Sequence, residues 1–279
     1  MIARSKTESL PGADLDPRKM PGHWLLARLG KRVLRPGGLE LTCRLVESLE
    51  IQASDSVVEF APGLGVTARL MLDRHPTSYT AIERDERAAR NLRRLLTGPR
   101  QRCLCGLADQ TGLASGTATV VYGEAILTMQ GPAQKTYIVR EAFRLLQPGG
   151  RYGIHELCLV PEDLDERLKL EVQSRLSETI RVGARPLTPG EWRSLLESEG
   201  FEIKQVSLAP MHLLEPARLL HDEGLLRACR FVWNVLRDGD ARSRVRRMHE
   251  VFRKYEACLA AIMLVACKAP APAPSLELQ

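Results

Sequence analysis

The feature that most constrains the fold lies at residues 56–85, where a strand, a glycine turn, a helix and a second strand follow one another. Val57 and Val58 form a short apolar run typical of a buried parallel strand. The turn at 61–65 reads Ala-Pro-Gly-Leu-Gly, and the second strand ends at Glu83. Glycines let the backbone approach a ligand closely, and an acid about 20 residues further on can hold a ribose diol. The stretch predicts a nucleoside site, against the alternative of an ordinary tight connection.

Glu59 favours a ligand without phosphate, because a carboxylate at the end of the first strand repels a pyrophosphate and attracts an ammonium group. The segment at 59–65, Glu-Phe-Ala-Pro-Gly-Leu-Gly, resembles motif I of the class I S-adenosylmethionine-dependent methyltransferases, small-molecule type. That motif is an acid followed by a Gly-x-Gly-x-Gly turn, and Ala61 here replaces its first glycine. S-adenosylmethionine carries an amino acid group, a sulfonium and an adenosine, so it meets both requirements.

The alternation of strands and helices continues beyond Glu83 and predicts a parallel sheet with helices on both faces. The segment Leu-Gln-Pro-Gly-Gly at 146–150 resembles the element that precedes the fifth strand in these methyltransferases. The resemblance extends over 51–208. It implies an α/β fold with a Rossmann-like, seven-stranded, mainly parallel sheet, N-terminal helices and a helical insertion before the last strand. Residues 201–207 and 258–268 would then form a reversed pair of strands.

The chain divides into six predicted parts. They are a loose N-terminal arm (1–20), N-terminal cap helices (21–50), the cofactor-binding core (51–208), a helical insertion (209–257), the last core strand (258–268) and a disordered tail (269–279). A plain hairpin between the last two strands would need only a few residues. The insertion is therefore a candidate lid, a candidate dimer surface, or both.

In a sheet of this kind, ligands bind beyond the carboxyl ends of the strands. The resemblance implies that Glu59 and the turn line the methionine end of the cofactor, that Glu83 holds the ribose, and that Leu107 and Ala108 flank the adenine. In many members of that family an acid directly follows the glycine after the third strand. Here Leu107 stands in that place and Asp109 comes two residues later, which counts against adenine recognition by Asp109. The cofactor-binding residues expected in full are Glu59, Ala61, Pro62, Gly63, Gly65, Glu83, Arg84, Leu107, Ala108, Tyr122 and Gly123.

Methyl transfer from a sulfonium is an in-line displacement that needs alignment of the reactants and exclusion of water. Glu124 and His155 follow two strand ends and are the candidate catalytic residues, His155 as a general base. A surface carboxylate and a hydrogen-bonded structural histidine are the alternatives. His23, Trp24 and Glu156 are candidate substrate residues. Three basic residues could also close over a substrate, although ordinary packing explains them equally well: Lys31, Arg32 and Arg35.

Composition and charge limit the partners. The net charge is +6 and the pI about 9.0, yet no single basic tract dominates, so nucleic acid is disfavoured. The basic helix predicted at 242–254 keeps RNA open as a substrate. The seven cysteines are scattered without a CxxC pair, which predicts a cytoplasmic chain without a metal site. The longest apolar run, 258–267, is too short to span a bilayer, and no membrane partner is expected.

These observations predict a methyltransferase that moves a methyl group from S-adenosylmethionine to a small, partly apolar acceptor enclosed by helical caps. S-adenosylhomocysteine is the expected product, and a homodimer through the insertion is compatible with the pattern. Three alternatives remain. They are an RNA methyltransferase, a non-catalytic scaffold that binds S-adenosylmethionine, and a nicotinamide-dependent oxidoreductase, which Glu59 and the Leu-Gln-Pro-Gly-Gly segment disfavour.

Overall fold

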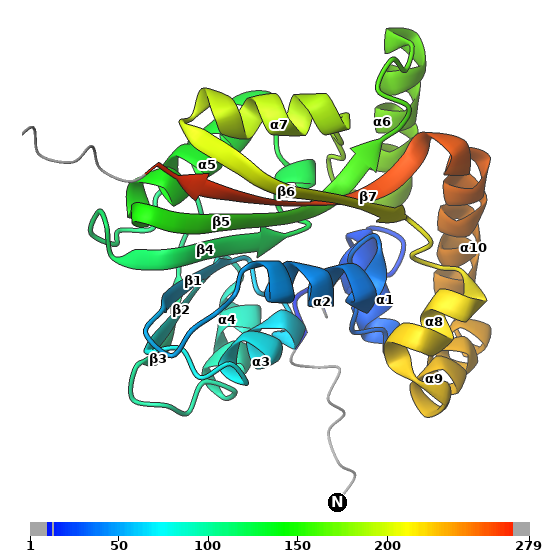
Figure 1. Cartoon of the computed structure of the whole chain (residues 1–279). Helices are drawn as coiled ribbons and strands as arrows, with labels where there is room; N and C mark the ends of the chain where they lie inside the picture. The colour runs from blue at the N-terminus through cyan, green and yellow to red at the C-terminus, as the bar shows by residue number, and fades with distance from the viewer. Residues whose placement is uncertain (1–9, 13, 270–279) are drawn as a thin grey trace, which may run out of the picture.

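A computed structural model describes residues 10–12 and 14–269. Its centre is a seven-stranded sheet in the order β3-β2-β1-β4-β5-β7-β6 (Figure 1). The strands β1 to β5 run parallel to one another, whereas β7 runs antiparallel between β5 and β6. The predicted Rossmann-like sheet is confirmed. The strands are β1 (Ser56–Phe60), β2 (Ser78–Glu83), β3 (Gln101–Cys105), β4 (Ala118–Glu124), β5 (Leu146–Leu159), β6 (Phe201–Pro210) and β7 (Leu259–Lys268).

Helices cover both faces of the sheet, because successive side chains of each buried strand point to opposite faces. Val57 packs with the helices of one face, and Val58 and Phe60 pack with those of the other. The first face carries α2 (Gly38–Ser48), α3 (Val66–Leu72) and α4 (Glu86–Arg93). The second face carries α5 (Pro132–Leu145) and α7 (Pro189–Ser198).

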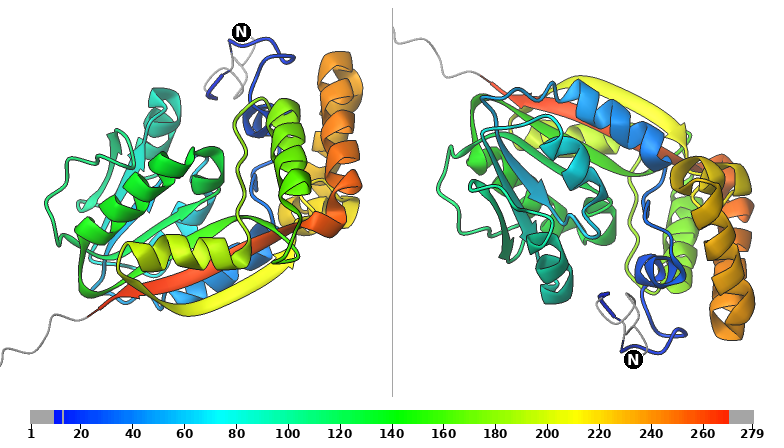
Figure 2. Two further views of the ribbon diagram at one scale, coloured as in Figure 1. Left: turned by 90° about the horizontal axis from the view of Figure 1, so that it is seen from above. Right: turned by 90° about the horizontal axis from the view of Figure 1, so that it is seen from below.

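Five further helices form a cap beyond the carboxyl ends of the parallel strands (Figures 1 and 2). They are α1 (Gly22–Leu29), α6 (Glu166–Ile180), α8 (Pro216–Glu223), α9 (Leu225–Arg237) and α10 (Gly239–Lys254). The last three are the predicted helical insertion. The cap has its own apolar core, to which Leu26 of α1, Phe231 of α9 and Met248 of α10 contribute. None of the helices among residues 10–12 and 14–269 is long and apolar enough to cross a membrane.

The prediction of a loose arm at 1–20 is wrong for the part that leads into α1. Met20 is fully buried, and Nη1 of Arg244 donates hydrogen bonds to the carbonyls of Pro17 and Met20 at 2.8 and 2.5 Å. Asp14 forms an ion pair with Arg87 of α4. The stretch is ordered because α10 supplies a buried donor that its sequence does not reveal. Residues 1–9, 13 and 270–279 lie outside the described residues, including nearly all of the predicted tail.

Arg244 provides a test of how the cap is held. Its guanidinium also donates to the carbonyl of Thr179, at the end of α6. Arg244→Met leaves three buried carbonyls without this donor, so we expect a loss of about 1–3 kcal/mol in the free energy of unfolding. Urea denaturation measures it. Arg246→Met, which removes an 81% exposed side chain on the same helix, is the matched control and should change stability by less than about 0.5 kcal/mol. Equal effects of the two changes would contradict this assignment.

Candidate functional site

A cavity of about 400 Å³ lies between the carboxyl ends of the strands and the cap. Its core wall comes from the glycine turn after β1 and from the ends of β2, β3 and β4. Its cap wall comes mainly from α1, α6 and α10. The cavity therefore lies where the strand order reverses between β2-β1 and β1-β4, which is where α/β sheets bind their ligands.

The glycine turn is fastened to the second strand. The N–H of Ala61 donates to the carbonyl of Ile82 at 2.9 Å, and the N–H of Gly63 donates to Oε2 of Glu83 at 3.1 Å. Ala61 has a φ of +52°, in the left-handed region that glycine adopts without strain. The alanine therefore follows the backbone path expected of the glycine that it replaces. Ala61 and Gly63 both line the cavity, and so does Pro62.

Glu83 lies at the floor of the cavity. It is 5% exposed, its Oε1 accepts a hydrogen bond from the N–H of Asp85 at 3.0 Å, and its Oε2 accepts the bond from Gly63. Burial raises the pKa of this carboxyl, while the two backbone hydrogen bonds oppose the rise. A carboxylate oxygen has more than one acceptor direction, so Glu83 retains capacity for the two hydroxyl groups of a ribose.

Glu59, in contrast, does not line the cavity. Strand alternation turns its side chain into the core beside the helices of the first face, where the hydroxyl of Tyr79 donates a hydrogen bond to it. Burial raises the pKa of Glu59 to about 7, against the opposing effect of the tyrosine hydroxyls. The predicted contact of Glu59 with the methionine end is therefore not found. Tyr122 is also buried in the core.

Glu124 is the most highly connected side chain of the site. Its Oε1 accepts a hydrogen bond from Thr42 at 2.7 Å and lies 2.8 Å from Nδ1 of His155. Thr67 donates to Oε2, and Nη1 of Arg35 lies 3.4 Å from the same oxygen. Burial opposes ionisation, but the charge of Arg35 and the hydrogen bond with His155 outweigh it and hold the pKa of Glu124 at about 2. An ionised carboxylate therefore lines the cavity.

His155 lies behind Glu124, away from the cavity. The side chain is fully buried, and Nε2 is 2.6 Å from the carbonyl of Pro36 while Nδ1 faces Glu124. Both ring nitrogens thus face oxygen atoms inside the core. No nitrogen is left to take a proton from a substrate. This geometry contradicts the prediction of a general base and makes His155 a positioning residue for Glu124.

Glu156, a predicted substrate residue, does not line the cavity but holds part of the cavity wall in place. The fully buried carboxylate accepts hydrogen bonds from the N–H groups of Ile126, Leu127 and Thr128 and from the hydroxyl of Thr128. Ile126 and Thr128 line the cavity. Glu156 therefore fixes the loop after β4, because four donors satisfy carboxyl oxygens that would otherwise be costly to bury.

The cap wall is mostly apolar. Trp24 lines it together with residues that the sequence analysis did not single out as site residues, among them Leu176, Ile180, Met248 and Phe252. His23 of α1 also lines the cavity, and its pKa is lowered to about 4 by burial and, second, by the charge of Arg84. The imidazole is therefore neutral at pH 7. Two neutral amides also line the cavity, Gln130 from the loop after β4 and Gln134 from the start of α5.

The cavity thus brings together ten of the predicted site residues: His23, Trp24, Ala61, Pro62, Gly63, Glu83, Arg84, Leu107, Ala108 and Glu124. Asp109, Arg32 and Arg35 line it as well. Gly65 and Gly123 do not line the cavity. Both lie where neighbouring side chains leave no room for a Cβ atom. A Cβ on Gly65 would lie 2.7 Å from Leu92, and one on Gly123 would lie 3.0 Å from Ile126.

Lys31 does not close over the cavity. It is fully buried in the cap, where its Nζ lies 3.9 Å from Asp222 and 4.0 Å from Glu223 at the end of α8. Glu223 also accepts hydrogen bonds from the N–H groups of Arg32 and Val33. Lys31 therefore helps to join the connection after α1 to the helical insertion.

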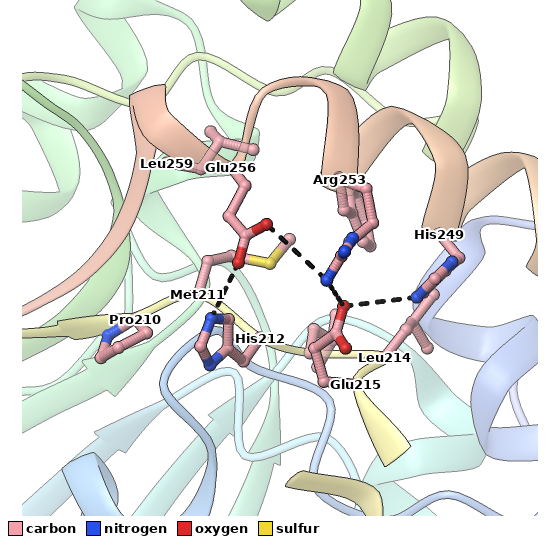
Figure 3. Close-up of a pocket in the computed structure, with 11 residues that line it drawn as sticks. Pro210, Met211, His212, Leu214, Glu215, His249, Arg253, Glu256 and Leu259 are labelled. Atoms are coloured by element: carbon pink, nitrogen blue, oxygen red, sulfur yellow. Dashed lines mark hydrogen bonds and ion pairs between the residues drawn. The ribbon is translucent and has the colours of Figure 1, made fainter. Parts of the chain in front are cut away.

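A second pocket of about 50 Å³ lies between the end of β6 and α10 (Figure 3). His212 pairs with Glu256 at 3.2 Å and His249 with Glu215 at 3.3 Å, while Arg253 lies within 4 Å of both carboxylates. The pocket is too small for a nucleoside. Its ion pairs instead connect the start of the insertion to α10. Within the described part of the chain, no group of three His, Cys, Asp or Glu residues could hold a metal ion.

Comparison with known proteins shows what the core is similar to. Residues 58–154 match the family model described as a methyltransferase domain. A curated protein of Haemophilus influenzae, described as uncharacterised, is 28% identical over 239 residues, which is 84% of this chain and 93% of that protein.

Solved structures share the fold at low sequence identity. The (4+2)-cyclase SpnF has a TM-score of 0.66 at 15% identity, with 90% of this chain and 97% of that chain covered. Phosphoethanolamine N-methyltransferase 2 of Haemonchus contortus, solved with phosphomonomethylethanolamine and S-adenosylhomocysteine, has a TM-score of 0.67 at 13% identity, with 89% and 57% covered. Residues 58–154 are thus similar to a methyltransferase domain, and the chain shares its fold with these solved structures; the match disfavours the oxidoreductase alternative.

The raised pKa of Glu59 predicts how the stability of the protein changes with pH. The folded protein keeps this carboxyl protonated up to about pH 7, whereas the unfolded chain ionises it from about pH 4.5. The free energy of unfolding of the wild type, relative to Glu59→Gln, should therefore fall by up to about 3 kcal/mol between pH 4.5 and 7 and stay level above.

Urea denaturation of both proteins at several pH values measures this difference. Glu141→Gln is the control, because the partners of this carboxylate among the described residues are Arg144 and Thr111 and include no histidine. Burial opposes its ionisation, but hydrogen bonds from Arg144 and Thr111 outweigh burial and lower the pKa of Glu141, so its pH-dependent contribution is lost only as the pH falls below 4.5. Its difference from the wild type should be level between pH 5 and 7. A level difference for Glu59→Gln over this range would contradict the buried, protonated carboxyl.

Proposed function

We propose that the protein transfers a methyl group from S-adenosylmethionine to a small, partly apolar acceptor held under the cap. The observation that carries this proposal is the continuity of one cavity, from the buried carboxylate of Glu83 to the apolar wall of α1, α6 and α10. A cofactor on the core wall and an acceptor on the cap wall would face each other across it. Alignment and exclusion of water are the main contributions that such a displacement requires.

The adenosine half of the cofactor would occupy the side of the cavity near β2 and β3. Glu83 accepts hydrogen bonds from the ribose hydroxyls, and Leu107 and Ala108 flank the adenine. Asp109 lines the same side of the cavity, within reach of the adenine edge or of solvent. The fixed turn at Ala61 and Gly63 lets the backbone run close to the sulfonium-bearing chain without side chains in between.

The amino acid end of the cofactor would meet Glu124 and Arg35. Glu124 is ionised and suits the ammonium group. Nη2 of Arg35 is buried and has no hydrogen-bond partner within the described residues, whereas Nε of the same side chain bonds Thr42 and Nη1 faces Glu124. A buried donor without a partner costs free energy. The carboxylate of the cofactor would satisfy it, so the two side chains form a pair complementary to an α-amino acid.

The acceptor would be neutral or anionic. The cap wall contributes no Asp or Glu side chain to the part of the cavity lined by described residues, so a cationic acceptor would lack a counter-charge there. Trp24, Met248 and Phe252 provide apolar contacts, while Gln130 and the neutral His23 can orient a polar group. His23 is the side chain best placed to accept a proton or hydrogen bond from the acceptor atom.

Calorimetric titration tests cofactor binding. We expect S-adenosylmethionine and S-adenosylhomocysteine to bind with micromolar dissociation constants, and Glu83→Gln to weaken both by about tenfold or more, because a carboxylate oxygen is lost as acceptor. Glu86→Gln, on the exposed first turn of α4, is the matched control and should leave affinity unchanged. A folded wild-type protein that binds neither ligand would contradict the proposal.

Turnover must be tested separately, because a non-catalytic scaffold would also bind the cofactor. Purified protein incubated with S-adenosylmethionine carrying a labelled methyl group and a panel of small neutral and anionic acceptors should release S-adenosylhomocysteine. Cofactor binding without methyl transfer to any acceptor would favour the scaffold.

The pairing of Arg35 with a carboxylate has its own test. Arg35→Met should weaken S-adenosylmethionine about 10- to 100-fold, the usual cost of a lost charged hydrogen bond. Decarboxylated S-adenosylmethionine, which lacks only the carboxylate, should bind wild type and variant within about threefold of each other. Loss of affinity for both ligands to the same degree would contradict the assignment and leave Arg35 with a structural role.

A further inference from the structure

The outer face of α9 exposes large apolar side chains. Leu225, Leu226 and Trp233 are 66%, 87% and 59% exposed, and Val232 and Leu236 are also about half exposed. The opposite face of the helix packs into the cap through Ala228 and Phe231. Contiguous apolar surface of this kind commonly marks a site of interaction. The helix lies at the outer end of the cap, away from the sheet (Figures 1 and 2).

The helix is also basic, and its helical spacing places Arg230 and Arg237 beside the exposed apolar side chains, whereas Arg227 lies toward Arg32 at the cavity edge. α9 contains Arg227, Arg230 and Arg237 and no acidic residue, and the guanidinium of Arg237 lies 5.6 Å from the ring centroid of Trp233. The segment 225–254 contains nine Lys and Arg residues and three Asp and Glu residues, a formal charge of +6. That equals the net charge of the whole chain, so the positive excess is concentrated in α9 and α10.

The combination of exposed apolar groups and arginines selects among partners. A second copy packed on this face about a two-fold axis would bring arginines against arginines without a carboxylate of α9 between them. A single-stranded nucleic acid would find one exposed aromatic ring and no stacking platform. An anionic bilayer satisfies both features, because apolar side chains enter the headgroup boundary, arginines meet lipid phosphates, and tryptophan favours that interface.

We propose that α9 docks the protein on the surface of an anionic membrane, with its axis in the plane of the headgroups. This binding goes beyond methyl transfer. It also revises the expectation of no membrane partner, which rested on the absence of a spanning segment and did not consider an amphipathic helix lying on the surface.

The position of α9 relates the membrane to the cavity. Nδ2 of Asn234 donates to the carbonyl of Leu29 at 2.8 Å, which fixes α9 against α1. Arg32 lines the cavity, and its pKa is lowered by burial and, second, by the charge of Arg227. The start of α9 therefore lies next to the cavity edge. Docking would place the apolar chamber near the lipid phase, where an apolar acceptor accumulates.

Vesicle flotation of the full chain tests the proposal. We expect binding to vesicles of phosphatidylcholine mixed with phosphatidylglycerol, little binding to phosphatidylcholine alone, and weakening by added salt. The double variant Leu226→Ser, Trp233→Ser and the double variant Arg230→Gln, Arg237→Gln should each lower the partition coefficient at least about tenfold. Leu170→Ser, at a 63% exposed leucine on α6, is the matched control and should bind like the wild type.

Tryptophan emission gives an independent measure. Of the three tryptophans, Trp192 is fully buried, Trp24 lines the cavity and Trp233 is exposed on α9. A blue shift on adding anionic vesicles should therefore disappear in Trp233→Phe, which keeps the face apolar and leaves Trp24 in place. Circular dichroism confirms that each variant is folded, and S-adenosylhomocysteine titration checks the cavity separately. A protein that does not bind S-adenosylhomocysteine would thus contradict the proposed function and would leave the test of the membrane surface unaffected.

Three results would overturn the proposal. The first is no binding of the folded wild type to anionic vesicles, or binding that the α9 variants leave unchanged. The second is a dimer in sedimentation equilibrium that Leu226→Ser, Trp233→Ser dissociates, which would assign the face to a second copy. The third is salt-sensitive RNA binding that is stronger than vesicle binding and is lost in the arginine variant but kept in the apolar one.

Discussion

The carboxylate of Glu124 connects the two halves of the site, and the other interactions of the site depend on it. The residue ends β4, and its partners come from α2, from α3, from β5 and from the connection that precedes α2. A buried carboxylate is tolerated only when it is paired and hydrogen-bonded. Arg35 meets that requirement and is thereby held at the cavity. The N-terminal segment, outside the stretch that matches the methyltransferase domain, is in this way part of the cavity wall.

Strand ends could be located from the sequence, but the face of the sheet to which each side chain points could not. Glu59 and His155 were both placed at the rim by the rule that ligands bind beyond the carboxyl ends. Glu59 shares a face with the core residue Val57, and His155 shares one with Gly153, whose position packs against Leu45 of α2. Both side chains therefore point into the packing layer. Glu83 is predicted from its spacing after the glycine turn, and it does line the cavity. There its Oε2 accepts a hydrogen bond from the N–H of Gly63 in that turn.

The cap was predictable as helices but not as a wall of the cavity. A helical apolar period shows that Met248 and Phe252 belong to a buried face, but it does not show what that face contacts. The same limit applies to Lys31, whose partners Asp222 and Glu223 lie about 190 residues along the chain. His23 and Trp24, two of the predicted substrate residues, do line the cavity. The exposed face of α9 shows as an amphipathic helix in the sequence, but only the packing shows which side is free.

The central claim is that this cavity holds S-adenosylmethionine with its ribose on Glu83 and its amino acid group between Glu124 and Arg35. A crystal structure of the protein with S-adenosylhomocysteine tests it most directly. We expect both ribose hydroxyls within hydrogen-bonding distance of the Glu83 carboxylate and the ligand carboxylate on Nη2 of Arg35. A ligand bound elsewhere, or bound here with its adenine toward Glu124, would contradict this account.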